Sequence, residues 1–221
     1  MTASAAFEQR PRTPAQAWAA LQAGNHRFAA GQPLHPNQDV DRRVDTAARQ
    51  APFAVMLGCS DSRVAAEIIF DRGIGDLFVV RTAGHLLGTD ALASIEFAVH
   101  GLRTPLVVVL GHDRCGAVEA AVRASHSGAT PPGFQRAIVE HLLPCVLAAK
   151  ARGITDHDEI GRAHITSTAD LLVRQSTLVR DAVDRGECAI VGAAYRLQEG
   201  RVQVVERIGP LPTTVADVEA S

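Results

Sequence analysis

The chain has 221 residues, of which 47% are hydrophobic and 21% are charged, and its formal net charge is -2. These values are typical of a globular protein, and the balanced charge gives no electrostatic reason to expect nucleic acid or an acidic membrane as a partner. The length suits one large domain, and no linker-like tract divides the sequence.

Targeting and disulfide signals are weak in this sequence. Residues 1–6 lack a basic region followed by an apolar core, so we expect no signal peptide. No apolar run approaches the roughly 20 residues that a membrane span needs. The four cysteines are widely and irregularly spaced, and we interpret Cys145 and Cys188 as buried small hydrophobic residues. These features favour a reducing, cytoplasmic compartment.

The first third of the chain predicts a helical arm ahead of the first strand. Residues 1–12 are expected to be disordered. Thr13 and Pro14 then resemble an N-cap followed by proline at the first helical position, which predicts a helix over residues 15–30. The apolar face around Trp18 must cover a surface, either on its own domain or on a partner subunit.

From residue 53 onward, apolar runs alternate with helical patterns. Four buried strands and a final half-exposed strand are predicted over residues 53–58, 77–80, 105–110, 188–194 and 201–206. Helices are predicted over residues 65–70, 90–102, 115–125, 134–151 and 159–184, after a polar loop over 34–45 and a short helix ending at Gln50. Pro144 predicts a kink or break in its helix.

This alternation predicts the fold class. Helices between successive strands imply a parallel sheet with right-handed crossovers, whereas the last two strands form an antiparallel hairpin. We therefore expect a single α/β domain over residues 13–208, with about four parallel strands and an antiparallel edge strand flanked by helices. Residues 209–221 are expected to be a tail.

Two polar motifs directly follow buried strands. Residues 59–63 read Cys-Ser-Asp-Ser-Arg, and residues 112–116 read His-Asp-Arg-Cys-Gly. Cys59 and Asp61 are two residues apart, so on a strand both project from the same face at the end where open α/β sheets bind ligands. If the two strands are neighbours, both motifs meet at one edge of the sheet.

Together the two motifs supply ligands suited to zinc, namely Cys59, His112 and Cys115 with Asp61 or water in the fourth position. Cys115 precedes Gly116, where a helix begins, and the helix dipole favours a thiolate there. A structural zinc site is closed by four protein ligands, whereas a catalytic site keeps a place for water. The residues alone leave both alternatives open.

Both motifs resemble those of the β-class carbonic anhydrases, especially the bacterial, actinobacterial type. The likeness extends through residues 78–84 (Phe-Val-Val-Arg-Thr-Ala-Gly) and 95–97 (Ile-Glu-Phe), and covers about residues 13–208. It implies zinc-dependent, reversible hydration of carbon dioxide to bicarbonate and a proton by zinc-bound hydroxide. It also implies that Asp61 and Arg63 form an orienting pair, and that Asp61 can swing onto the metal and so act as a pH-dependent gate.

The resemblance implies a substrate pocket as well. Gln50 and the Gly116 amide match hydrogen-bond donors to substrate, Phe78 matches an aromatic wall, and Phe97 stands where many relatives have tyrosine. The family likeness and the helical arm point to a homodimer or a dimer of dimers, with pocket residues shared across the interface. Met56 occupies the tryptophan position of a second bicarbonate site known in some relatives, although Arg81 and Tyr195 match its other two residues.

Three functions remain open at this point. The first is carbon dioxide hydration, the second is hydrolysis of carbonyl sulfide or carbon disulfide at the same site, and the third is a non-catalytic zinc protein. Arg63 disfavours the third, because a permanently closed site has no use for a partner to Asp61. His85 is the one histidine we consider as a proton shuttle, and a structural hydrogen-bonding role is the alternative for it.

Overall fold

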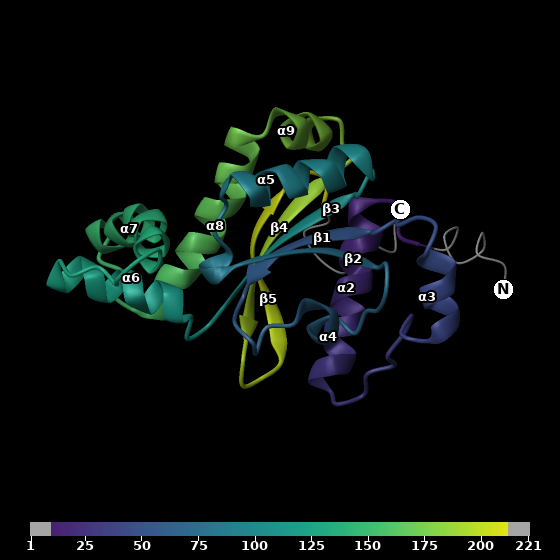
Figure 1. Cartoon of the computed structure of the whole chain (residues 1–221), viewed down its shortest axis with the longest axis horizontal. Helices are drawn as coiled ribbons and strands as arrows, with labels where there is room; N and C mark the ends of the chain where they lie inside the picture. Colours follow the sequence, from purple (N-terminus) through teal and green to yellow (C-terminus); the bar gives the residue numbers. More distant parts are fainter. Residues whose placement is uncertain (1–9, 212–221) are drawn as a thin grey trace.

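The apolar runs form one five-stranded sheet in the computed structural model, which describes residues 10–211. The strand order is β2-β1-β3-β4-β5, with three parallel pairs and an antiparallel β4–β5 pair (Figure 1). The strands are β1 (Ala54–Cys59), β2 (Leu77–Thr82), β3 (Leu106–His112), β4 (Ala189–Arg196) and β5 (Arg201–Ile208). The expected α/β architecture is confirmed, and β1 and β3 are neighbours.

Helices cover both faces of this sheet because alternate strand residues point to opposite sides. Met56 and Val108 face a cluster with α2 (Pro14–Ala29) and α4 (Ala66–Ile69), while Val55 and Val107 face α5, α8 and α9. The remaining helical bounds are α3 (Val40–Thr46), η1 (Ala83–His85), α5 (Thr89–Glu96), η2 (Phe97–Gly101), α6 (Gly116–Ser127), α7 (Gln135–Ala151), α8 (His157–Gln175) and α9 (Thr177–Asp184). No described helix is long and apolar enough to cross a membrane.

The helical arm forms as its cap predicts. The Thr13 side chain accepts the Gln16 backbone N–H, and the Gln16 side chain accepts the Thr13 backbone N–H, so both exposed donors are satisfied. Trp18 and Leu21 are buried against the sheet, so the arm covers its own domain. Residues 1–9 and 212–221 lie outside the described residues, and most of the segments expected as disordered or as a tail fall there.

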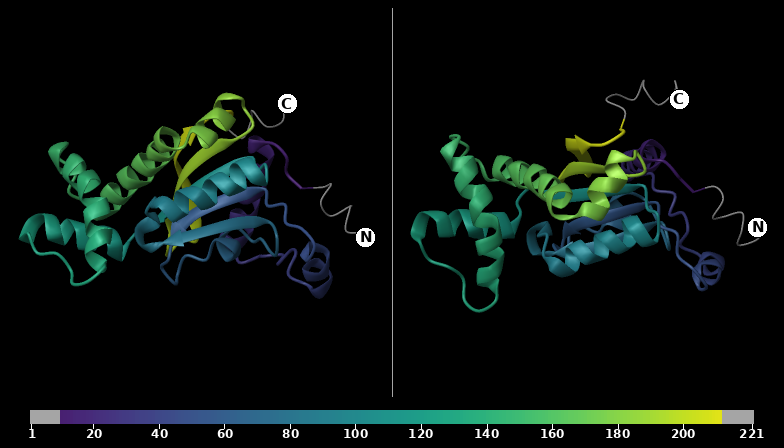
Figure 2. Two further views of the ribbon diagram at one scale, coloured as in Figure 1. Left: turned by 45° about the horizontal axis from the view of Figure 1, so that its top comes forward. Right: turned by 90° about the horizontal axis from the view of Figure 1, so that it is seen from above.

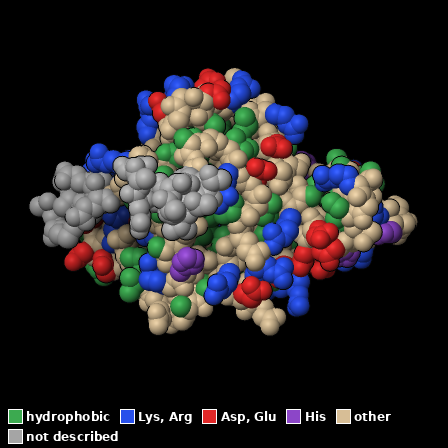
Figure 3. Space-filling model, turned by 180° about the vertical axis from the view of Figure 1, so that it is seen from behind, with side chains coloured by type: hydrophobic (Ala, Val, Ile, Leu, Met, Phe, Trp, Pro, Cys, Tyr) green, Lys and Arg blue, Asp and Glu red, His purple; other side chains and the backbone are tan. Residues whose placement is uncertain are grey.

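A third cluster lies beyond the end of the sheet. Helices α6 and α7 stand away from the strands at one end of the molecule and pack on each other and on the start of α8 (Figures 1 and 2). Cys59 and Cys115 belong to this cluster. The face seen in Figure 3 carries interspersed acidic and basic side chains, which agrees with the balanced composition.

Several predicted boundaries were wrong for local reasons. The short helix is Val40–Thr46 rather than a segment ending at Gln50. It begins inside the predicted loop because the Asp39 side chain accepts the Arg42 backbone N–H and caps its first turn. Helix α7 runs through Pro144 without a break, since proline removes one donor and the residue four positions earlier, Glu140, is exposed to solvent. The predicted helix over 159–184 divides at Ser176, whose side chain accepts the Val179 N–H and starts α9.

Candidate metal centre

Cys59, His112 and Cys115 meet at the carboxyl ends of β1 and β3. Cys59 ends β1, His112 ends β3, and Cys115 precedes the first residue of α6. One ligand atom from each side chain lies within 4.8 Å of the other two, and all three residues are buried. The parallel pairing of β1 with β3 therefore brings together three ligands from two distant segments.

The imidazole of His112 has the correct tautomer for a metal ligand. Its Nδ1 lies 2.8 Å from the Asp113 carbonyl oxygen, which can only accept, so Nδ1 carries the proton. Its Nε2 is buried and has no hydrogen-bond partner among residues 10–211. A buried lone pair without a partner is costly, and a cation at this point would satisfy it.

The two thiols are set up to bind a cation together. A hydrogen bond from Cys115 lowers the pKa of Cys59 against the opposing effect of burial. The same pairing, together with burial, raises the pKa of Cys115, so the metal-free pair shares one proton. Backbone amides of Asp61 and Gly84 lie 3.4 and 3.3 Å from the Cys59 sulfur and favour its thiolate. Two thiolates and one imidazole fit Zn²⁺.

Asp61 faces the three ligands but is held by Arg63. Arg63 Nε and Nη2 donate to the two carboxylate oxygens at 2.9 and 2.6 Å, and the Arg63 backbone N–H adds a third bond at 2.9 Å. These bonds lower the pKa of Asp61, so its carboxylate is charged. Asp61 Oδ2 lies 3.9 Å from His112 Nε2. The carboxylate is thus beside the centre without joining it.

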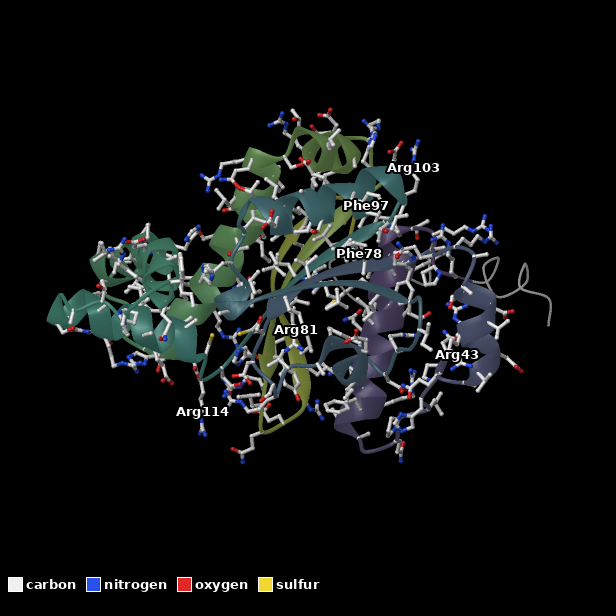
Figure 4. The ribbon with its side chains drawn as sticks, in the orientation of Figure 1. Arg43, Phe78, Arg81, Phe97, Arg103 and Arg114 are labelled. Carbon is white, nitrogen blue, oxygen red and sulfur yellow. The ribbon has the colours of Figure 1, made fainter. Side chains whose placement is uncertain are left out.

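Arg81 is a supporting residue that the sequence reasoning missed at this site. Its Nε donates to the Cys59 carbonyl oxygen at 2.9 Å, and its Nη2 donates to the Asp61 carbonyl oxygen at 2.6 Å (Figure 4). It therefore fixes the backbone of the loop that carries both side chains. Its place in the stretch 78–84, at the end of a predicted strand, was the signal in the sequence, whereas its pairing with Gly58 is known only from the structure.

His85 does not have the exposure that a proton shuttle needs. It is 1% exposed, and neither ring nitrogen has a hydrogen-bond partner within the described part of the chain. The shuttle assignment and the alternative hydrogen-bonding role are both wrong for this conformation. Burial lowers the pKa of His85 well below its usual value, so the ring is neutral.

The expected pocket residues fall into two groups. Gly116 lies beside Cys115 at the start of α6. Gln50 precedes the start of β1, and Phe78 pairs in register with Val55, near the opposite end of the strand from Cys59. Phe97 packs on Phe78, with ring centroids 6.2 Å apart (Figure 4). One chain therefore does not bring Gln50, Phe78 and Phe97 to its own metal ligands.

Comparisons with known proteins agree with this arrangement. A family model described as carbonic anhydrase matches residues 54–202. The chain is 50% identical over 196 residues to carbonic anhydrase 2 of Mycobacterium tuberculosis, covering 89% of this chain and 95% of that protein. A β-carbonic anhydrase structure from Aspergillus fumigatus gives a TM-score of 0.67 at 25% identity, covering 92% and 95% of the two chains. One of two tetrameric β-carbonic anhydrases from Sordaria macrospora shares the fold, with a TM-score of 0.67 at 22% identity and coverage of 85% and 95%.

Proposed function

The chain belongs to the β-class carbonic anhydrase family, and from this premise we propose that it interconverts carbon dioxide and bicarbonate at a zinc centre held by Cys59, His112 and Cys115. The observation that supports this most is the buried trio itself, with its ligand atoms within 4.8 Å of one another and the Nε2 lone pair of His112 without a partner. When bound, zinc supplies a Lewis acid that lowers the pKa of water and makes a hydroxide nucleophile available near neutral pH.

Asp61 orients the nucleophile in this proposal. With both carboxylate oxygens engaged by Arg63, Asp61 is charged and can still accept a hydrogen bond from the attacking O–H group through a second lone pair. That bond would aim the oxygen lone pair toward carbon dioxide. The backbone amide of Gly116 is the proposed donor to the substrate oxygen. Asp61 and Arg63 thus act as a pair, each needed for the geometry of the other.

The same pair forms the proposed pH-dependent gate. If Asp61 left Arg63 and turned toward the trio, its carboxylate would occupy the fourth coordination position. Hydroxide competes for that position and becomes more abundant as the pH rises, so alkaline conditions favour the Arg63-paired arrangement. We therefore expect hydration activity to increase with pH.

Assembly completes the proposed pocket. Gln50, Phe78 and Phe97 lie away from the ligands of their own chain, and Phe97 is 55% exposed. Strand β2 is an edge strand, with no further strand beside it among the described residues. We assign this edge to contact with a second copy of the chain, whose metal centre these side chains would approach. A homodimer, or a dimer of dimers, of one domain spanning residues 13–208 follows.

The need for free thiolates favours a reducing compartment. Cys59 and Cys115 must both be unoxidised to hold a cation, and all four cysteines are free thiols in this structure. We accordingly assign the protein to the cytoplasm.

Stopped-flow measurement of carbon dioxide hydration across pH, with zinc content determined on the same samples, tests the proposal. Asp61→Ala should lose activity at every pH, whereas Arg63→Ala should lose most at neutral pH and recover toward alkaline pH. Arg185→Ala is a matched control, because Arg185 forms a similar exposed pair with Glu187 at 3.0 Å, away from the centre. Its activity should equal that of the unmodified protein.

Four results would overturn parts of this assignment. Unchanged activity in Asp61→Ala would remove the orienting role, and an unaltered pH profile in Arg63→Ala would remove the gate. Faster turnover of carbonyl sulfide than of carbon dioxide would give the same site a different substrate. A protein that retains zinc but hydrates no carbon dioxide at any pH would show that the metal is structural.

A further inference from the structure

A buried histidine from a distant helix reaches the turn behind Cys59. His164 of α8 lies with its Nε2 3.0 Å from the carbonyl oxygen of Gly84. A carbonyl oxygen can only accept, so Nε2 is the donor. The N–H of the same glycine points at the Cys59 sulfur at 3.3 Å. Gly84 is therefore held from both sides, by an imidazole and by a metal ligand.

His164 acts on the Cys59 sulfur through the orientation of the Gly84 backbone. The N–H of Gly84 belongs to the peptide unit shared with Ala83, whereas its carbonyl oxygen belongs to the unit shared with His85. No single peptide group links His164 to the sulfur, so the imidazole cannot strengthen the N–H donor by polarising one amide. The bond to His164 restrains the φ and ψ angles of Gly84, and these angles set the direction of its N–H.

The turn needs such a restraint because its conformation is unusual. Gly84 has φ of 71° and ψ of 23°, and the next residue, His85, has φ of 45° although it is not glycine. Successive left-handed residues are rare, and a side chain makes the second of them strained. Strained backbone persists only where the surroundings hold it, and here the strain lies directly behind a metal ligand.

His85 supports His164 by packing. The two rings lie 4.4 Å apart between centroids at an interplanar angle of 33°. Both residues are buried, and burial lowers the pKa of each, so both rings are neutral. Since His85 has no polar partner among residues 10–211, its contribution is the ring surface that it places against His164.

Helix α8 also contacts the second ligand-bearing loop. Near its start, Asp158 Oδ1 accepts the backbone N–H of Arg114 at 2.9 Å, next to Cys115. One rigid helix thus contacts the loop before Cys115 and, two turns later, the turn behind Cys59. The two loops that carry the thiols therefore both contact one helix, α8, which lies outside the ligand motifs.

We propose that His164 is a positioning residue for the metal centre, which orients the Gly84 amide toward the Cys59 sulfur and so slows loss of the metal. The inference rests on the proposed function only in taking Cys59 as a zinc ligand. Nothing in the mechanism of hydration requires His164 to contact substrate.

The test measures zinc release from the loaded protein to an excess of a colorimetric chelator. His164→Leu removes the donor and should release zinc about tenfold faster or more, as expected when an outer partner of a ligand is lost. His164→Gln places an amide nitrogen near the position of Nε2 and should restore most of the retention. His164→Asn places its amide near Nδ1, too short to reach Gly84, and should behave like the leucine variant.

Two further measurements separate positioning from loss of stability. Leu172→Val alters a fully buried residue about two turns further along α8, and should leave zinc release unchanged even where it lowers the melting temperature. In Co²⁺-substituted protein, the thiolate-to-metal absorption band should shift in His164→Leu and return in His164→Gln.

Equal zinc release from the glutamine and leucine variants, or release from His164→Leu at the unmodified rate, would overturn the proposal. If the unmodified protein binds no zinc, the assigned function fails instead, and the two failures are therefore distinguishable.

Discussion

Replacing Gly84 with alanine tests whether the turn behind Cys59 must lack a side chain. At φ of 71° an L-residue costs about 1–2 kcal/mol. An added Cβ would also lie 2.9 Å from the Cβ of Ala117 in α6. Carbon atoms prefer separations of about 3.5–4.0 Å, and forced overpacking of a buried region costs about 1–3 kcal/mol. The expected loss in unfolding free energy is therefore about 2–5 kcal/mol.

Gly31→Ala provides the matched comparison. Gly31 has φ of 69°, and nothing lies within 4 Å of an added Cβ, so only the backbone cost of about 1–2 kcal/mol applies. Both replacements restrict the unfolded chain in the same way, so that contribution cancels between them. The difference between the two variants isolates the close approach of the turn to α6.

Urea unfolding of both variants without metal gives the two free energies. Zinc release from both gives a second readout, because moving Gly84 also moves the N–H that lies 3.3 Å from the Cys59 sulfur. We expect faster release from the Gly84 variant alone. Equal losses of stability in the two variants, with equal zinc retention, would refute the reasoning.

Three other replacements test separate features. His85→Phe keeps a ring against His164 and removes an unpartnered buried N–H, so the unfolding free energy should rise by about 1 kcal/mol. The dependence of hydration on buffer concentration should not change in that variant, and a change would return His85 to proton transfer. Asp71→Asn should lower the unfolding free energy by about 2 kcal/mol at neutral pH, because Asp71 accepts bonds from Arg27 at 2.6 Å and from two backbone amides. Burial raises the pKa of Asp71, but these donors outweigh burial and lower the pKa overall. The stabilisation by Asp71 is therefore complete above the unfolded pKa of about 3.9. Below that pH it is lost, and the unfolding free energies of the two proteins should become equal. Phe97→Asp should weaken self-association at least tenfold by analytical ultracentrifugation, and loss of its packing on Phe78 should lower monomer stability by about 1 kcal/mol. An unchanged solution mass would argue against the β2 edge as the interface.

The sequence was informative wherever a pattern was local. Uniformly apolar runs indicated buried parallel strands, and polar motifs after two of them indicated where Cys59 and His112 would meet. The division at Ser176 was not predicted, because serine also occurs inside helices and nothing nearby in the sequence shows that its hydroxyl donates to the Glu96 carboxylate, at 2.6 Å. That partner comes from a distant helix.

Long-range contacts account for the remaining omissions. Nothing near His164 in the sequence relates it to Gly84, and only the packing of α8 against the end of β3 places the two together. The burial of His85 was equally unpredictable, because a glycine-histidine turn after a strand does not indicate whether the histidine ring is buried. The partners that we propose for Gln50 and Phe97 lie on a second copy of the chain, which no single sequence pattern describes.

The wide separation of Cys59 from His112 and Cys115 along the chain affects when the protein can acquire a metal. During synthesis the first thiol leaves the ribosome well before the other two ligands exist, so a nascent chain offers only a monodentate and easily exchanged site. The trio forms only once β3 has docked beside β1, so a complete metal site requires this tertiary pairing and neither motif provides it alone. A cation bound there favours the folded state by mass action. A chelator should therefore lower the yield of folded protein from newly made chains before it affects chains that are already folded.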